Sequence, residues 1–304
     1  KIVSTIINFR PVLVHSVAIK PVIYSAIACM IKKINARVFA LAGLGFIFTS
    51  SKISAKILSP LIKIILKVLF YGEQTALILQ NPDDKDAIID SDIIKENQVN
   101  LIYGAGVDTS IYHYKKIPNM DVPLIILSAR MLWAKGIKDF IKAAEKINSN
   151  QVRARFVLVG IPDKKNPDAV PIENLQKLNE AGLVEWWGYQ KSMAEVYHQA
   201  SIVCLPTTYG EGLPKSLLEA ASCGRPIVTY DVPGCREIVK DGFNGFLIIP
   251  RDIEGLVKAL SHLLKNYNKC VELGNNGRKL VKKYFNQEKI AKETLNVWEK
   301  VLSI

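Results

Sequence analysis

The first 72 residues contain no aspartate or glutamate, although they contain ten lysines and arginines. The first acidic residue is Glu73, and the rest of the chain carries 30 basic and 28 acidic residues. The net charge of +12 therefore arises almost entirely in the N-terminal part, which favours an anionic partner for that part. The chain lacks a recognisable nucleic-acid motif, so a membrane surface fits better than nucleic acid.

Paired cysteines and metal-ligand clusters are also lacking. The five cysteines form no C-x-x-C pair and no cluster with the four histidines that resembles a metal site. Cys204 and Cys223 lie in apolar or helical stretches typical of small buried residues. This pattern favours a reducing, cytoplasmic compartment over a disulfide scaffold. Two D-x-D sequences, at 84–86 and 90–92, lie in a polar helical stretch, which favours a solvated face over a metal site.

What the chain does have is a regular alternation of short apolar runs and helical patterns. With 304 residues it is long enough for two domains, and the alternation predicts α/β domains with parallel sheets. We place the limits at residues 1–110, 111–285 and 286–304, the last segment being a helix. Strands are expected at Pro11–His15, Ala36–Leu41, Leu77–Gln80, Val99–Ile102, Leu124–Ser128, Arg155–Gly160, Val184–Trp187, Ile202–Leu205, Pro226–Tyr230 and Gly245–Ile248.

The stretch before Tyr71 carries a stripe of lysines. Lys52, Lys56, Lys63 and Lys67 fall within an arc of about 60° on a helix. The residues placed opposite them are Ile53, Ile57, Leu58, Leu61, Ile64, Ile65, Val68 and Leu69. Lysines inside the apolar part argue against a transmembrane helix and favour a helix lying on an anionic membrane surface. The alternatives are a helix that packs on its own sheet, or two helices divided at Pro60.

Two glutamates, Glu211 and Glu219, lie eight positions apart in the sequence EGLPKSLLE, directly after an apolar run. A helix expected at Pro214–Cys223 places Glu211 in the strand-to-helix loop and Glu219 about a turn and a half into the helix. The free N–H groups of a helix N-terminus suit an anionic ligand. A nucleotide-sugar offers hydroxyls for the carboxylates and a diphosphate for the amides.

Arg130 and Lys135 flank the loop after the strand expected at Leu124–Ser128, at the edge where ligands gather in open α/β sheets. A guanidinium and an ammonium together can neutralise a diphosphate and the charge that develops on a leaving phosphate. The alternative is an ordinary surface arginine and lysine at the start of a helix.

The segment from Glu211 to Glu237 is similar to the E-x7-E region of retaining family 4 glycosyltransferases, which have the GT-B fold. The sequence SARMLWAKG at 128–136 matches the R-x4-K phosphate-binding element of that family. The sequence VEWWG at 184–188 resembles a subgroup that builds bacterial surface polysaccharides and lipid-linked sugars. The resemblance runs from about Leu13 to the C-terminus.

This resemblance implies two Rossmann-like domains facing across a cleft, with the last helix returning to the first domain. The donor would bind mostly to the second domain and the acceptor to the first, and no metal or other cofactor is expected. Glu211 would bind hydroxyls of the donor sugar and Glu219 those of the ribose. The backbone at Gly212, Leu213 and Pro214 would approach the sugar and phosphate.

His15 opens the sequence HSVAIKP, which resembles the H-x-x-x-x-K-P signature of the same subgroup. It would hydrogen-bond an acceptor or donor hydroxyl, and a core histidine is the alternative. Lys20 and Gly43-Leu44-Gly45 are second-rank candidates near the same place. The glycines lack the third glycine and the acidic partner of a dinucleotide-binding fingerprint.

The expected function is therefore retaining transfer of a hexose from a UDP-sugar to a lipid-linked or polysaccharide acceptor, in bacterial cell-surface glycan synthesis. The expected location is the cytoplasmic face of the plasma membrane. Family members usually carry a first strand and a glycine-rich loop before the segment at Leu13, so we expect an incomplete first domain. The alternatives are an epimerase of UDP-sugars and a non-catalytic fragment that binds nucleotide-sugars or membranes. A nucleic-acid-binding role ranks below these.

Overall fold

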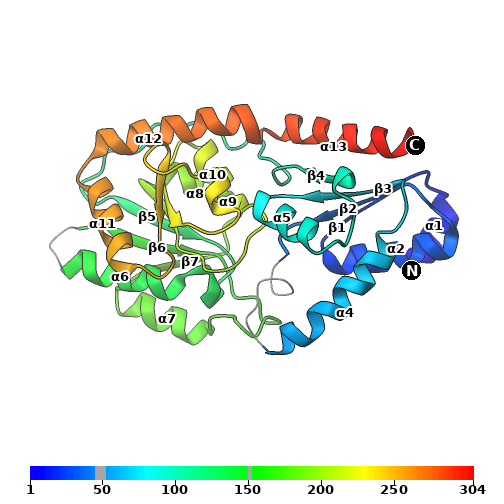
Figure 1. The fold of residues 1–304 in the computed structure, drawn as a ribbon. Helices are drawn as coiled ribbons and strands as arrows, with labels where there is room; N and C mark the ends of the chain where they lie inside the picture. The colour runs from blue at the N-terminus through cyan, green and yellow to red at the C-terminus, as the bar shows by residue number, and fades with distance from the viewer. Residues whose placement is uncertain (45–52, 150–152) are drawn as a thin grey trace. The chain divides into compact units, whose positions relative to one another are not determined.

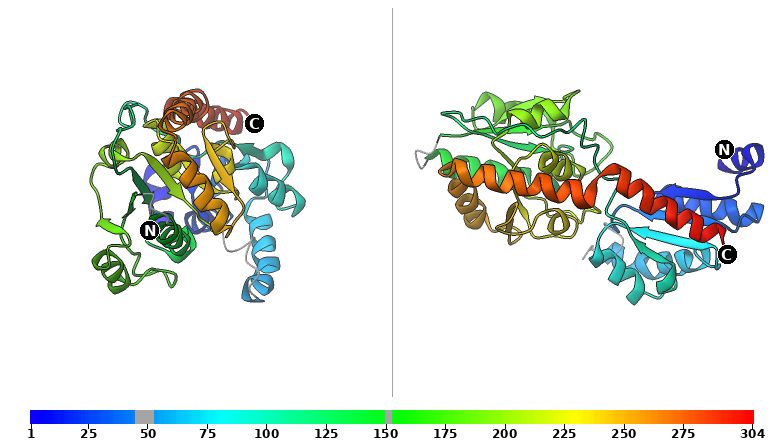
Figure 2. Two further views of the ribbon diagram at one scale, coloured as in Figure 1. Left: turned by 90° about the vertical axis from the view of Figure 1, so that its left-hand side faces the viewer. Right: turned by 90° about the horizontal axis from the view of Figure 1, so that it is seen from above.

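The computed structural model describes residues 1–44, 53–149 and 153–304, which form two compact units (Figures 1 and 2). Unit 1 comprises Lys1–Gly106, Gly210–Leu213 and Gln287–Ile304, and unit 2 comprises Val107–Tyr209 and Pro214–Asn286. The domain limits expected from the sequence, at residues 1–110, 111–285 and 286–304, stay a prediction. They describe parts of the chain that would fold independently.

Unit 1 contains a four-stranded parallel sheet in the order β1-β2-β3-β4. Its strands are β1 (Val14–Val17), β2 (Arg37–Leu41), β3 (Thr75–Leu79) and β4 (Val99–Leu101). Its helices are α1 (Ile2–Phe9), α2 (Ile19–Lys32), α4 (Ile53–Leu69), α5 (Pro82–Asp90), η1 (Glu96–Gln98) and α13 (Gln287–Leu302). The helix α1 was not expected from the sequence.

Both faces of this sheet are covered, because side chains alternate between the two faces of a strand. On one face Phe39 and Leu41 of β2 pack in a core with residues of α2 and α4. On the other face Val38 and Ala40 share a core with Ile290, Val297 and Val301 of α13. The C-terminal helix is thus part of the apolar core of unit 1.

Unit 2 contains a six-stranded parallel sheet in the order β10-β9-β8-β5-β6-β7. Its strands are β5 (Leu124–Ser128), β6 (Arg155–Val159), β7 (Glu185–Gly188), β8 (Ile202–Leu205), β9 (Ile227–Tyr230) and β10 (Gly245–Ile248). Its helices are η2 (Trp133–Lys135), α6 (Ile137–Ser149), α7 (Ile172–Glu180), α8 (Met193–Gln199), α9 (Lys215–Ser222), α10 (Cys235–Ile238), α11 (Ile253–Leu264), α12 (Tyr267–Leu280) and η3 (Val281–Phe285).

The first strand of this sheet, β5, pairs with β6 on one side and with β8 on the other. The strand order therefore reverses direction between β5 and β8. In open α/β sheets ligands bind outside the carboxyl ends of the strands at such a reversal. The loops that follow β5 and β8 are consequently the first place to look for a ligand site in unit 2.

The helix α4 differs from the expected arrangement of its apolar side chains. It is a single helix with Pro60 inside it. Leu66 and Leu69 point into the core, whereas Ile64 and Val68 are 62% and 54% exposed and lie beside Lys67. The face of α4 that packs on the core is rotated from the apolar face expected opposite the lysines, because it includes Leu66, which is not in the expected set. Lys52 lies outside the described residues.

In the first D-x-D sequence Asp86 is exposed, as expected, but Asp84 is not. Asp84 is buried, and its Oδ2 accepts hydrogen bonds from the backbone N–H of Leu44 at 3.2 Å and from Asn81 Nδ2 at 2.9 Å. Burial raises the pKa of this carboxyl. Asp84 instead ties the chain after β2 to the start of α5, where the side chain of Asn81 caps the helix.

Candidate functional site

Two loops of unit 2 are locked together at the carboxyl ends of β5 and β8. The backbone N–H of Thr208 donates to the carbonyl of Ala134 at 3.0 Å. Gly136 has a φ of 82°, and a Cβ atom at this position would overlap the carbonyl oxygen of Pro206. Glycine is therefore required here by both conformation and space. The loop that carries Arg130 and Lys135 is held against the loop after β8.

The two predicted phosphate-binding cations lie on this loop. Lys135 Nζ is 5.4 Å from the centroid of the Tyr209 ring, so the loop after β8 helps to position the ammonium. Arg130 is exposed and forms an ion pair with Asp163, with 3.1 Å between Nη1 and Oδ2. Such an exposed pair stabilises by about 1 kcal/mol or less, so an anionic ligand can replace Asp163.

Glu219, in the second turn of α9, is only 7% exposed. It is therefore not a solvated helix carboxylate. Tyr197 donates to its Oε2 at 3.3 Å, and Lys215 Nζ lies 3.7 Å from its Oε1. Tyr112 also hydrogen-bonds the carboxylate. Burial raises the pKa of Glu219, while the hydrogen bonds from Tyr112 and Tyr197 and the charge of Lys215 oppose that rise.

The N-terminus of α9 begins one residue later than expected. Pro214 is the N-cap residue, outside the helix, and none of the described side chains caps the first turn. Proline at this position offers no N–H of its own, so the open amides start at Lys215. They lie on the same helix as Glu219, about one turn before it.

The predicted donor-binding residues Glu211, Gly212 and Leu213 belong to unit 1 by their contacts. Asn81 Nδ2 lies 3.3 Å from the carbonyl oxygen of Glu211 and 3.1 Å from that of Gly212. A Cβ atom at Gly212 would lie 2.7 Å from the backbone nitrogen of Gly43. Of the second-rank candidate Gly43-Leu44-Gly45, Gly43 thus lies close to Glu211 and Gly212, and Gly45 lies outside the described residues.

His15 lies on β1 and packs edge-on against Trp298 of α13, with ring centroids 5.6 Å apart. The indole Nε1–H of Trp298 donates to His15 Nδ1 at 3.2 Å. Because an indole is only a donor, Nδ1 must be unprotonated, and the neutral ring carries its proton on Nε2. Burial lowers the pKa of His15, which favours this neutral form. Nε2 is buried without a hydrogen-bond partner among the described residues, so its N–H can serve a ligand.

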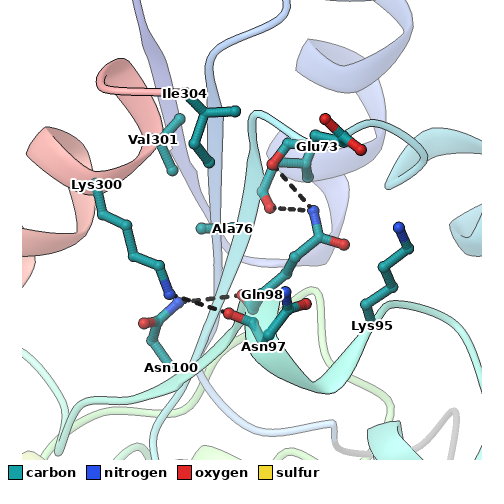
Figure 3. A pocket seen from close by; sticks show the side chains of 10 residues that line it. Glu73, Ala76, Lys95, Asn97, Gln98, Asn100, Lys300, Val301 and Ile304 are labelled. Atoms are coloured by element: carbon teal, nitrogen blue, oxygen red, sulfur yellow. Dashed lines mark hydrogen bonds between the residues drawn. The ribbon is translucent and has the colours of Figure 1, made fainter.

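A separate cavity of about 240 Å³ lies beside the amino end of β3 and the last turn of α13 (Figure 3). Lys300 Nζ donates there to the carbonyl of Asn97 at 3.1 Å, and Gln98 Nε2 donates to that of Thr75 at 2.7 Å. None of the predicted site residues lines it. It lies at the amino edge of the sheet, away from the carboxyl ends where ligands bind in such folds.

Three residues of the described sites were missed by the sequence argument: Tyr112, Tyr197 and Trp298. Each acts through a partner distant in sequence, and no motif marks them.

In the described ranges, no three histidine, cysteine, aspartate or glutamate side chains are arranged to hold a metal ion. All five cysteines are buried, as expected for Cys204 and Cys223, and none forms a disulfide. Of the helices in the described part, none has the length and apolar character needed to cross a bilayer.

Solved structures with the same fold identify the architecture. Sucrose-phosphate synthase from Thermosynechococcus elongatus superposes with a TM-score of 0.81 at 20% identity, covering 99% of this chain and 76% of that one. The Anabaena protein HepE, solved in complex with UDP, gives a TM-score of 0.78 at 18% identity, with coverages of 98% and 82%. The expected fold class, α/β with two parallel-sheet units as in GT-B glycosyltransferases, is confirmed.

Among sequence relatives, an N,N'-diacetylbacillosaminyl-diphospho-undecaprenol alpha-1,3-N-acetylgalactosaminyltransferase of Campylobacter jejuni is 26% identical over 309 residues, covering 95% of this chain and 77% of that protein. Two uncharacterized glycosyltransferases of Methanocaldococcus jannaschii are 26% and 28% identical, and the chain spans 57% and 56% of their lengths. Residues 108–280, more than half of the chain, match the model of the family described as glycosyl transferases group 1. The chain therefore belongs to the group 1 glycosyl transferases.

Proposed function

We propose that this chain transfers a hexose from a UDP-sugar to a lipid-linked or polysaccharide acceptor, with retention of the anomeric configuration. The observation that carries the proposal is the position of Glu219. A buried carboxylate lies one turn into a helix with an open N-terminus, beside the reversal of strand order in unit 2. Carboxylates accept hydrogen bonds from ribose hydroxyls, and helix amides bind phosphate.

The sugar-diphosphate bond breaks more easily if the departing phosphate is neutralised. We assign this role to Arg130 and Lys135, on the loop after β5. The backbone of Gly212, Leu213 and Pro214 is assigned to the sugar and phosphate, and Glu211 to the sugar hydroxyls. With no carboxylate nucleophile assigned, the acceptor hydroxyl attacks the anomeric carbon on the face that the phosphate leaves. The sugar–phosphate bond breaks, the hydroxyl proton passes to the departing phosphate oxygen, and the configuration is retained.

His15 is assigned to an acceptor or donor hydroxyl, which its Nε2–H would hydrogen-bond. Removing one such donor costs about 100-fold in kcat or more where the bond strengthens in the transition state. We therefore expect His15→Ala to lower kcat about 100-fold with a small change in KM for the donor. An unchanged kcat would assign His15 to the core alone.

The donor assignment is tested by calorimetric titration with UDP, UDP-N-acetylglucosamine and GDP. Glu219→Ala should weaken UDP binding roughly 10- to 100-fold, because a hydrogen bond to a charged group stabilises by about 1.5–3 kcal/mol. Glu195→Ala, an exposed glutamate of α8, is the matched control and should bind like the unchanged protein. Failure of all three ligands to bind would contradict the proposal.

Transfer and retention are tested by nuclear magnetic resonance of the product formed from a UDP-sugar and an undecaprenyl-diphosphate-linked acceptor. The anomeric coupling should match that of the donor. Release of a free epimerised sugar without acceptor would instead indicate an epimerase, and donor binding without turnover a binding module. We further propose that no metal is required, since two cations are assigned to the diphosphate, so EDTA should leave the rate unchanged.

We also propose that unit 1 contacts an anionic membrane surface at the inner face of the plasma membrane. The absence of acidic residues before Glu73 supports this, together with exposed Ile64 and Val68 beside Lys67 on α4. Lys67 pairs with Asp92 in an exposed ion pair that lipid headgroups can replace. Lys52, Lys56 and Lys63 complete the predicted basic stripe.

Sedimentation with vesicles tests this surface. Binding to vesicles containing anionic phosphatidylglycerol should exceed binding to neutral phosphatidylcholine. Lys63→Gln and Lys67→Gln should each weaken it roughly five-fold, because a lysine near an anionic surface is worth about 1 kcal/mol. Lys142→Gln and Lys258→Gln, both exposed in unit 2, are the matched controls. Equal losses in both pairs would mean that the effect is one of net charge alone.

A further inference from the structure

A chain of hydrogen bonds runs from the end of β5 to Glu219 through the interior of unit 2. The hydroxyl oxygens of Ser128 and Tyr197 are 2.8 Å apart, and Tyr197 Oη lies 3.3 Å from Glu219 Oε2. Ser128 and Tyr197 are both buried, Tyr197 completely. The chain therefore lies where water does not compete for its bonds.

The direction of these bonds follows from counting protons. A phenol has one proton, and an ionised carboxylate only accepts, so Tyr197 must donate to Glu219. The oxygen of Tyr197 is then left to accept from Ser128. The side chain of Ser128, two residues before Arg130, thus fixes the hydroxyl rotor of Tyr197, which in turn fixes one oxygen of the carboxylate.

A second tyrosine approaches the same carboxylate from another segment. Tyr112 hydrogen-bonds Glu219, and its ring centroid lies 6.4 Å from that of Tyr197. Its own carbonyl accepts from Ser222 Oγ at 2.6 Å and from Arg278 Nη1 at 2.9 Å. Arg278 also donates to the carbonyl of Thr109 at 3.0 Å, so α12 holds the segment that carries Tyr112.

The carboxylate of Glu219 offers about four acceptor positions. The two tyrosines occupy two of them, and Lys215 approaches a third from 3.7 Å. An acceptor position remains, and part of the side chain is still exposed. A hydroxyl can donate to this position, whereas an anion cannot. A ribose offers such donors in its 2′ and 3′ hydroxyls.

We propose that Tyr112 and Tyr197 are positioning residues, which hold the Glu219 carboxylate in the orientation that accepts hydrogen bonds from ribose hydroxyls. The ribose part of this inference rests on the proposed function, and the positioning part does not. Lys215, Tyr112, Tyr197 and Cys223 are the titratable groups that act on Glu219 or its tyrosine partners.

The positioning part is tested without any ligand, by nuclear magnetic resonance titration of the protein labelled at the glutamate carboxyl carbon. Glu219→Gln identifies the signal by its loss. Tyr112→Phe and Tyr197→Phe each remove a hydrogen bond to the charged form, so the pKa of Glu219 should rise in both. Tyr230→Phe is the matched control, because the Tyr230 hydroxyl donates to Asp139 at 2.7 Å elsewhere in unit 2.

The two outcomes are distinct. A raised pKa of Glu219 in Tyr112→Phe and Tyr197→Phe, with no change in Tyr230→Phe, supports positioning by the two hydroxyls. An unchanged pKa in all three variants overturns it. A variant that fails to fold is replaced by the other tyrosine variant, since either one alone decides whether its hydroxyl acts on Glu219.

The ribose part is tested by comparing UDP with 2′,3′-dideoxyuridine diphosphate on the protein with both tyrosines replaced. Affinity for UDP should fall roughly ten-fold, while the weaker affinity for the dideoxy ligand should stay the same. Equal losses for the two ligands would show that the tyrosines do not act through the ribose hydroxyls. If the unchanged protein does not bind UDP, the proposed function and the ribose assignment fail together, and the titration of Glu219 still decides the positioning.

Discussion

The tautomer of His15 follows from one contact with an indole. Trp298 Nε1 donates to Nδ1, so the ring proton should reside on Nε2 at neutral pH. Nitrogen-15 resonance of the ring should show this tautomer in the unchanged protein and a mixture in Trp298→Phe. Trp187→Phe, which removes an indole donor to Glu185 in unit 2, should leave the His15 signal unchanged. A proton found on Nδ1 would contradict the geometry.

The burial of Glu219 also has a consequence for stability. Its folded-state pKa is raised above the ordinary value of 4.5, mainly by burial. The net cost of burying that charge is present above the folded-state pKa and disappears as the pH falls below 4.5, where both states are protonated. We expect Glu219→Gln to raise the melting temperature at pH 7 and to have no such effect at pH 4. A lower melting temperature at pH 7 would show that the hydrogen bonds outweigh the burial.

At the scale of single elements, the start of α2 is strained. Ala18, its N-cap residue, has φ 74° and ψ 150°, a combination that glycine alone adopts readily. This strain costs about 1–3 kcal/mol, and a glycine at position 18 would relieve it. Part of the relief is offset because glycine has a larger conformational entropy in the unfolded state. We expect Ala18→Gly to raise the free energy of unfolding in urea by about 1 kcal/mol. Ala291→Gly, exposed inside α13, should lower it by about 1 kcal/mol.

The loop after β5 depends on Gly136 for two separable reasons. Gly136 and Gly182 both have positive φ, but only at Gly136 does an added Cβ meet the backbone of Pro206. Gly182→Ala should therefore cost about 1 kcal/mol for the conformation alone, measured by urea unfolding. Gly136→Ala should cost at least twice that and should weaken UDP binding, because the Lys135 loop must move. Equal costs would mean that the two loops separate easily.

At the scale of the whole molecule, the sheet of unit 2 and its covering helices come from residues 107–286, apart from Gly210–Leu213. Core strands such as β5 and β8 are buried along their whole length within this unit. We expect a fragment of residues 107–286 to unfold cooperatively in urea, followed by circular dichroism. A gradual change without a transition would show that unit 2 depends on unit 1 for folding.

Much of the fold could be predicted from the sequence, because apolar runs and helical periodicity are local patterns. The strands at Leu124–Ser128, Ile202–Leu205 and Gly245–Ile248 were expected with the bounds that the structure has. The loop after β5, with Arg130 and Lys135, could be placed at the carboxyl edge of the sheet, because it directly follows a strand that the local pattern predicts. The apolar face of α4 could not, since the side that packs depends on α2 and the sheet, not on the periodicity of α4 itself.

The sequence by itself determined the succession of strands and helices, the charge asymmetry and the family resemblance of the Glu211–Glu219 segment. Only the tertiary structure decided what surrounds those residues. Tyr197 is 22 positions from Glu219, and Trp298 is 283 positions from His15. Contacts of this kind arise from strand order and helix packing, which bring together side chains that no local pattern relates. The orientation of a carboxylate and the tautomer of a histidine are therefore properties of the folded chain.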